Sequence, residues 1–487
     1  MQKILCSHII AACVLLSGCN SSDKYADPNA INGDQYTGTW IAPAYGEAMV
    51  VERNRVLYYQ YTSEYCIQSD TDNGSNADLE ENYWQISVDQ QRMRQVLSLY
   101  GIDQREPEYI KTDILPESCL QNLVKKKNES GYTADASRDF DFFWKMFYEY
   151  YPTFNKRNVD WESQRSELSV SLDANSSDET LFYALAEMIE PLGDSHVTVM
   201  LDASDDEGVN FTRGVTLIDR ITEEYISNNG SIDNDQQYSQ YLSYLEEQSE
   251  LVDQIRLSYA SDIENIKQAA NGNLTWYINS DNIGYLGIEN MIFFSGDNTD
   301  DISFVEEIDA LQSAMQQAMS DLTDTSGLII DIRKNPGGFD GASQLIARYF
   351  LDSERELYSK QARLGDSRTE LEIYKLQPVN NSYTKPIVLL TSAMTTSAAE
   401  VFALMMRNLP HVTLIGESTQ GALSDVLSKS LPNGFKIDLV NEYYLSPEGD
   451  FFEVEGVPVD YIQEFGTETQ RLNHMDDAIE LAIELLN

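Results

Sequence analysis

The chain has 487 residues, which is enough for two to four domains of ordinary size. Apolar residues make up 42% of it and aromatic residues 10%, so a sizeable core is expected and wholesale disorder is excluded. The 80 Asp and Glu residues outnumber 33 Lys and Arg residues, and the resulting net charge of −47 would repel a phosphate backbone. No nucleic-acid partner is therefore expected, and the acidic excess is most simply a solvated surface.

Residues 1–18 have the layout of a secretory signal peptide. Lys3 precedes an apolar stretch over residues 9–16 that is too short to span a bilayer, and small residues then lead to Cys19. The ending Leu-Ser-Gly-Cys resembles the bacterial lipobox, in which the cysteine carries acyl chains such as palmitate. The resemblance implies a lipid-anchored protein of the bacterial cell envelope, and Asn20 favours the outer membrane. The alternative is an ordinary signal peptide with a chance cysteine.

Two cysteines remain after the signal peptide and Cys19 are set aside. Cys66 and Cys119 form an even pair in a chain expected to reach an oxidising compartment, so a disulfide between them is predicted. No C-x-x-C or H-E-x-x-H spacing occurs, so neither a zinc site nor another metal or cofactor is expected.

The first half of the chain divides into four segments that differ in amino-acid composition. Residues 19–35 are polar and indicate a tether, and residues 36–130 contain short β-favouring runs between turns, which predict a β-rich N-terminal domain. Residues 131–201 place apolar side chains at three- and four-residue steps and predict a helical region. Residues 202–273 are acidic and predict a partly helical insertion.

Residues 274–487 alternate between strand and helix patterns. Strands are expected at residues 283–288, 327–332, 386–390 and 412–415, and helices at residues 302–319, 342–350 and 397–407. This alternation predicts an α/β layered domain.

Residues 395–400 lie between an expected strand and an expected helix. One interpretation is a capping box, in which Ser397 caps the helix and Glu400 reaches back to it. The other is a nucleophilic serine, because a helix N-terminus supplies oriented amides and positive potential for an oxyanion. The local motif fits both interpretations.

Seven short motifs occur in one order along the chain. They are GDSHV (193–197), DIRKNPGG (331–338), SAAE (397–400), GESTQG (416–421), LPNG (431–434), YLSPEG (444–449) and EVEGVPVD (453–460). Together they resemble the peptidases of family S41, the tail-specific and tricorn-core family, over about residues 134–200 and 274–487. The resemblance implies a ClpP/crotonase-like layered core with a helical cap region, and serine-type endopeptidase activity on a peptide or protein substrate.

The resemblance also implies roles for individual residues. Ser397 matches the nucleophile, and the backbone amides of Gly338 and Ala398 match the oxyanion hole. A glycine suits this position because the missing Cβ lets the backbone approach a substrate carbonyl closely.

The general base distinguishes two branches of the family. The C-terminal processing branch places a lysine where this chain has Ala422, so a Ser-Lys dyad is not expected. The tricorn-core branch uses a histidine after a serine, which Ser195 and His196 match, and imidazole titrates near neutral pH. Glu453 matches the acid that orients the histidine, and Glu455 is the competing candidate.

Alternatives to proteolysis remain open. The same scaffold could serve a non-catalytic peptide- or ligand-binding lipoprotein, since fold does not fix function. A crotonase-type acyl-CoA enzyme has a similar core, but export disfavours CoA substrates. Tail-specific members carry a PDZ domain, whereas residues 202–273 lack its glycine-rich loop, so recognition of substrate C-termini is not expected.

Overall fold

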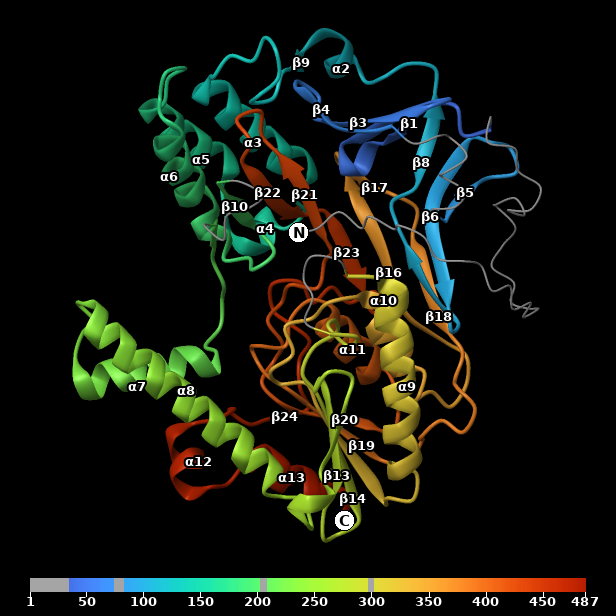
Figure 1. Ribbon diagram of the computed structural model, residues 1–487, viewed down its shortest axis with the longest axis vertical. Coiled ribbons are helices and arrows are strands. Elements are labelled where there is room, and N and C mark those ends of the chain that lie inside the picture. Colours follow the sequence, from blue (N-terminus) through green and yellow to red (C-terminus); the bar gives the residue numbers. More distant parts are fainter. Residues whose placement is uncertain (1–34, 74–82, 202–207, 297–301) are drawn as a thin grey trace.

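The computed structural model describes residues 35–73, 83–201, 208–296 and 302–487 (Figure 1). The predicted signal peptide and the lipid site Cys19 lie outside the described residues. Within the described ranges, no helix combines the length and apolar character needed to cross a membrane.

The N-terminal domain is a β-sheet in the order β5-β6-β8-β1-β2-β3-β4-β9, with β7 paired to β6. Its strands are β1 (Gly38–Ala42), β2 (Glu47–Glu52), β3 (Arg55–Tyr61), β4 (Cys66–Asp72), β5 (Trp84–Ile86), β6 (Arg92–Leu99), β7 (Ile102–Arg105), β8 (Tyr109–Thr112) and β9 (Leu123–Val124). Trp40, Met49 and Val56 are among its buried core residues. A disulfide joins Cys66 on β4 to Cys119 on helix α2 (Glu117–Gln121), as the cysteine count predicted.

A helical region follows and shares a sheet with strands from far along the chain. Its helices are α3 (Ala136–Tyr150), α4 (Phe154–Arg157), α5 (Trp161–Leu168) and α6 (Asp178–Ile189). The sheet order is β11-β10-β22-β21, built from β10 (Thr198–Met200), β11 (Gly208–Asn210), β21 (Val426–Ser430) and β22 (Lys436–Val440). Phe143, Leu185 and Ile437 belong to the core between these helices and this sheet. The predicted division at residues 201 and 274 therefore does not separate two independent units, because β21 and β22 complete the sheet of the helical region.

Helices α7 (Leu217–Asn229) and α8 (Asp235–Leu257) form a hairpin that projects from the body of the molecule (Figure 1). Thr216 and Asp219 form a capping box that starts α7, and the buried residues Val252 and Ile255 hold the end of α8. The predicted helical insertion is thus present, although β12 (Lys267–Ala269) already belongs to the sheet that follows.

The α/β core is a seven-stranded sheet in the order β12-β13-β14-β15-β19-β20-β24, parallel from β14 onward. Its remaining strands are β13 (Leu274–Ile278), β14 (Ile283–Ile288), β15 (Gly327–Asp331), β19 (Ile387–Thr391), β20 (Val412–Gly416) and β24 (Tyr461–Ile462). Its helices are α9 (Phe304–Leu322), α10 (Asp340–Ala347), α11 (Ala398–Arg407), α12 (Glu468–Asn473) and α13 (Asp477–Leu486). The predicted α/β class is confirmed.

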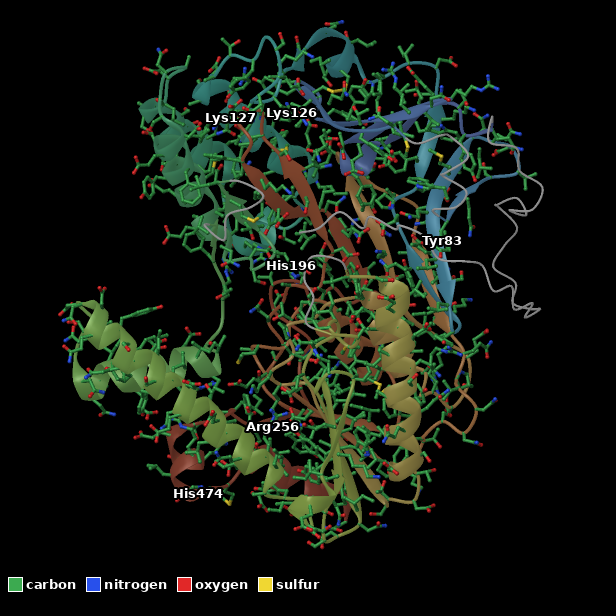
Figure 2. The ribbon with its side chains drawn as sticks, in the orientation of Figure 1. Tyr83, Lys126, Lys127, His196, Arg256 and His474 are labelled. Atoms are coloured by element: carbon green, nitrogen blue, oxygen red, sulfur yellow. A yellow bond between two sulfur atoms is a disulfide. The ribbon has the colours of Figure 1, made fainter. Side chains whose placement is uncertain are left out.

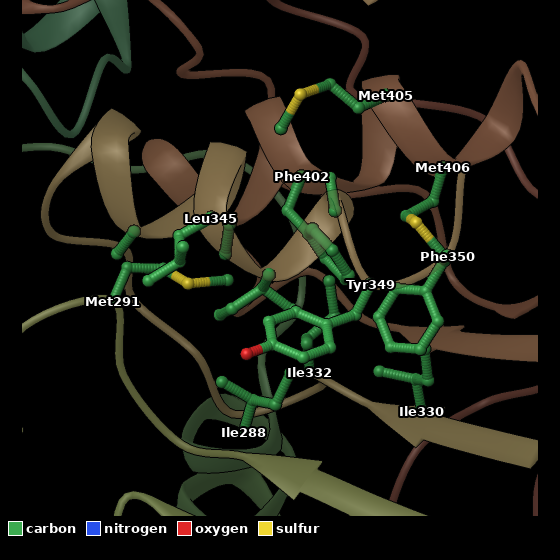
Figure 3. Close-up of a cluster of buried hydrophobic side chains, with 14 of the residues drawn as sticks. Ile288, Met291, Ile330, Ile332, Leu345, Tyr349, Phe350, Phe402, Met405 and Met406 are labelled. Carbon is green, nitrogen blue, oxygen red and sulfur yellow. The ribbon is translucent and has the colours of Figure 1, made fainter. Parts of the chain in front are cut away.

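Both faces of the core sheet are covered, which explains why its strands are continuous apolar runs. Leu328 and Ile330 of β15 point into the cluster with α9, α10 and α11, part of which Figure 3 shows. Ile329 points to the opposite face and packs with Ile479 of α13. This alternation follows from the two-residue period of a strand.

A smaller sheet lies between the core and the N-terminal domain. It contains β16 (Arg355–Leu364), β17 (Ser367–Arg368), β18 (Glu372–Leu376) and β23 (Glu442–Leu445). Glu372 pairs with Arg94 at 2.8 Å and with Arg105 at 2.9 Å, which ties this sheet to the N-terminal domain.

Candidate active site

Ser397 lies on the sharp turn between β19 and α11, at the carboxyl edge of the parallel strands. Its backbone has φ 58°, a left-handed conformation that non-glycine residues rarely adopt. A strained strand-to-helix turn of this kind presents a nucleophile at the top of a sheet. The side chain is half-buried, and the backbone N–H donates to the carbonyl of Ala422 at 3.1 Å.

Two backbone amides beside Ser397 lack an acceptor. Neither the Gly338 N–H nor the Ala398 N–H donates a hydrogen bond to any described residue. Gly337 packs so closely on the turn that a Cβ placed there would lie 2.6 Å from Cβ of Ser397. A Cβ on Gly338 would lie 2.4 Å from the carbonyl carbon of Met291. Both positions therefore require glycine, and the free amides could hold an oxyanion.

Asn335 fixes the glycine turn against the serine turn, a role that the sequence analysis missed. Its side chain donates to the carbonyl of Ile288 at 3.1 Å and accepts from the N–H of Gly337 at 2.9 Å. Its own carbonyl accepts from the N–H of Thr396 at 3.1 Å. The asparagine of the N-P-G-G motif is thus the signal that could have identified this role.

Asp331 supports the same turn from inside the core. It accepts hydrogen bonds from Arg333 at 2.7 Å, Tyr285 at 2.8 Å and Arg256, labelled in Figure 2, at 3.1 Å. Burial acts to raise the pKa of Asp331, but the two guanidinium groups outweigh it and hold that pKa well below the usual range.

His196 follows a tight turn at the end of the helical region, at the junction with the core (Figure 2). Its backbone N–H donates to Asp194 at 3.1 Å, and its Nδ1 is 2.8 Å from the carbonyl oxygen of Ser424. Asp194 is itself held by Tyr151 at 2.6 Å and by Arg157 at 2.9 Å. Within the described residues, no hydrogen bond joins the His196 ring to the Ser397 hydroxyl, although both residues bond to the segment 422–424.

Glu453 is fully buried and does not hydrogen-bond to the histidine. One carboxylate oxygen accepts from the N–H groups of Leu423 at 2.9 Å and Ser424 at 3.1 Å. Any effect of Glu453 on the His196 ring therefore passes through Ser424, whose N–H binds Glu453 and whose carbonyl binds the ring. Burial and the nearby Asp194 raise the pKa of Glu453 well above its usual value, against the opposing effect of Arg157.

Glu455 and Ser195, two further residues that the motifs indicated, have different surroundings. Glu455 is exposed and pairs with Lys156, whereas Glu453 is buried. The hydroxyl of Ser195 hydrogen-bonds to the side chain of Gln420, which links the histidine segment to the same loop as Ser424.

Ala422 occupies the position where one family branch has a lysine, and it contributes only backbone atoms. The nearby Lys360 is bound to Glu442 at 3.2 Å and Asp425 at 3.4 Å. Burial acts to lower the pKa of Lys360, but the surrounding acidic and phenolic groups raise it well above the usual value. These contacts hold the Lys360 ammonium in ion pairs, which disfavours a role as the base.

Comparisons with known proteins relate part of the chain to peptidases. Residues 282–463 match peptidase family S41. Carboxy-terminal processing protease CtpA of Bacillus subtilis is 28% identical over 131 residues, which are 27% of this chain and 27% of that protein. The tricorn protease of Thermoplasma volcanium is 32% identical over 166 residues, which are 33% of this chain and 15% of that protein.

The match thus spans about a quarter or less of these two relatives. In structure, a candidate peptidase of Parabacteroides merdae aligns with 73% of this chain and 97% of its own, with a TM-score of 0.54 and 21% identity. That likeness shows a shared fold. The family match and the ordered motifs together show that the core of the chain is similar to the peptidases of family S41.

Proposed function

We propose that the chain is a serine endopeptidase that cleaves peptide bonds through an acyl-enzyme. The observation that carries the proposal is the position of Ser397 on a strained turn beside two amides, those of Gly338 and Ala398, that have no acceptor among the described residues. Such unpaired donors are the feature that stabilises a developing oxyanion.

In the proposed reaction, Ser397 Oγ attacks the scissile carbonyl and its proton passes to His196. The accepting atom is Nε2, because Nδ1 is engaged by the carbonyl of Ser424. The negative charge on the carbonyl oxygen is held by the Gly338 and Ala398 amides. The imidazolium then gives its proton to the leaving amine, and water, deprotonated by the same ring, hydrolyses the acyl-enzyme.

Ser397 and His196 must approach each other for this transfer. Catalytic hydrogen bonds are often long in proteins without substrate and shorten when substrate binds. Both residues are bonded to the segment 422–424.

Cleavage inside a chain is proposed in preference to removal of C-terminal residues. The helical hairpin α7–α8 occupies the part of the sequence where tail-specific relatives have a domain for C-termini. We further propose that Cys19 anchors the mature protein to a bacterial membrane.

Profiling against a peptide library tests the proposed activity. The wild-type protein should cleave internal bonds, as identified by mass spectrometry of the products, and Ser397→Ala should not. Equal cleavage by both proteins would refute the proposal. Tight peptide binding without any cleavage would instead support a non-catalytic binding protein.

A further inference from the structure

The segment 419–424, named here the bridging loop, contacts both proposed catalytic residues. The carbonyl of Ala422 accepts from the backbone N–H of Ser397, and the carbonyl of Ser424 binds Nδ1 of His196. The bridging loop therefore determines where each of the two residues lies relative to the other.

Glu400 holds one end of the bridging loop. Its side chain is completely buried on the first turn of α11. One carboxylate oxygen accepts from the hydroxyl of Thr419 at 2.6 Å and from the N–H of Gly421 at 2.7 Å. The other accepts from the N–H of Ala422 at 2.8 Å and from the N–H of Ser397 at 3.2 Å.

Through these four bonds, the carboxylate of Glu400 links the proposed nucleophile Ser397 to the bridging loop. The same carboxylate oxygen contacts the N–H groups of Ser397 and Ala422, so the two backbones keep one spacing. Glu453 holds the adjacent N–H groups of Leu423 and Ser424, at the histidine end. Four successive backbone donors, from residue 421 to residue 424, are thus satisfied by two buried carboxylates.

We propose that Glu400 is a positioning residue, which acts through the bridging loop to hold Ser397 in place for attack on the substrate. This inference rests on the proposed peptidase function. A glutamine cannot reproduce the carboxylate contacts, because it has one acceptor oxygen and its NH₂ group would face at least one backbone N–H donor in either orientation. Misplacement of a catalytic group by about 1 Å can lower the rate about 100-fold.

The test compares Glu400→Gln with Glu307→Gln. Glu307 is a matched control, since it is also buried and accepts backbone N–H groups, from Phe294 at 2.6 Å and Ser295 at 3.1 Å, on the connection after β14. We expect Glu400→Gln to lower kcat by about 100-fold with KM within about threefold of wild type. We expect Glu307→Gln to lower Tm while kcat stays within about twofold. Circular dichroism at the assay temperature gives the folded fraction of each variant and corrects both rates.

A milder pair of variants covers the case in which Glu400→Gln does not fold. Thr419→Val removes one donor to Glu400 with little change of volume and should lower kcat, whereas Thr419→Ser keeps the hydroxyl and should retain it. The inference is overturned if the Glu400 and Glu307 variants lose kcat equally, or if Thr419→Val matches Thr419→Ser. Absence of hydrolysis by the wild-type protein would instead refute the proposed function itself.

Discussion

The imidazole of His196 is oriented by the backbone carbonyl of Ser424, with 2.8 Å between Nδ1 and the oxygen. In a Ser-His-Asp triad the acid contacts the histidine directly. Here the proposed acid, Glu453, binds the N–H of Ser424 at 3.1 Å, so its proposed action on the ring passes through that residue.

This arrangement predicts different effects for the two glutamates of the motif. Glu453→Gln can keep its one carbonyl oxygen on the N–H groups of Leu423 and Ser424, but it removes the negative charge that faces Arg157 at 3.9 Å. We expect the loss of this buried charge to shift the segment and to lower kcat by about 10- to 100-fold. Glu455→Gln is the control, because Glu455 is exposed, and its kcat should match wild type. Steady-state kinetics on one peptide substrate measures both, and equal losses in the two variants would contradict this account.

The buried Glu400 predicts a pH dependence of stability. Burial raises its pKa to about 7, although four hydrogen bonds oppose the shift. The unfolded chain titrates near about 4.3, so between these values the folded protein binds more protons at this site. The stabilisation is therefore full below about pH 4.3 and is lost as the pH rises through about 7, at a cost of about 4 kcal/mol. The raised pKa of Glu453 acts in the same direction.

Urea unfolding at pH 5 and pH 8 measures this loss. Glu400→Gln has no titrating group at the position, so its free energy of unfolding should fall less than that of wild type over the same interval. An identical fall in both proteins would show that Glu400 does not titrate in this range.

The disulfide predicts a stabilised N-terminal domain. Cys66 and Cys119 are separated by 53 residues, and closing a loop of that length in the unfolded chain is worth about 4 kcal/mol in the chain-entropy description. The double variant Cys66→Ala/Cys119→Ala should therefore unfold at a lower temperature and lose its sensitivity to reductant. Unchanged unfolding of the wild-type protein under reducing conditions would contradict the prediction.

Cys19 is predicted to carry the membrane anchor. Cys19→Ser should move the protein from the membrane fraction to the soluble fraction, since the lipid supplies the attachment. Metabolic labelling with a palmitate analogue checks the modification directly, and persistent membrane association of the unlabelled variant would rule it out.

The sequence predicted the core elements well where burial on both faces leaves continuous apolar runs. The expected strand at 327–332 is β15, and the expected helix at 397–407 is α11, each within one residue. The sequence did not predict the pairing of β22 with β10. Thr198 and Asp438 are paired across these two strands, although they are 240 positions apart in the sequence. A two-residue period identifies a strand and not its partner.

The sequence indicated which residues belong to the candidate site, but it did not predict which groups those residues contact. The motifs indicated Ser397, His196 and Glu453, and the capping pattern indicated that Glu400 reaches back to Ser397. The contacts of both glutamates with the bridging loop depend on how that loop lies between two sheets. No local pattern specifies such a placement.

The central claim is that Ser397 is the nucleophile and His196 its base, and one measurement tests it most directly. Single-turnover hydrolysis of a cleaved peptide should be compared for wild type, Ser397→Ala and His196→Ala at pH 8, with Lys360→Met as the control for a lysine base. We expect each of the first two variants to lose at least about 10³-fold in rate and the third to retain wild-type turnover per folded molecule. Near-normal turnover by His196→Ala, together with loss of turnover in Lys360→Met, would contradict the account.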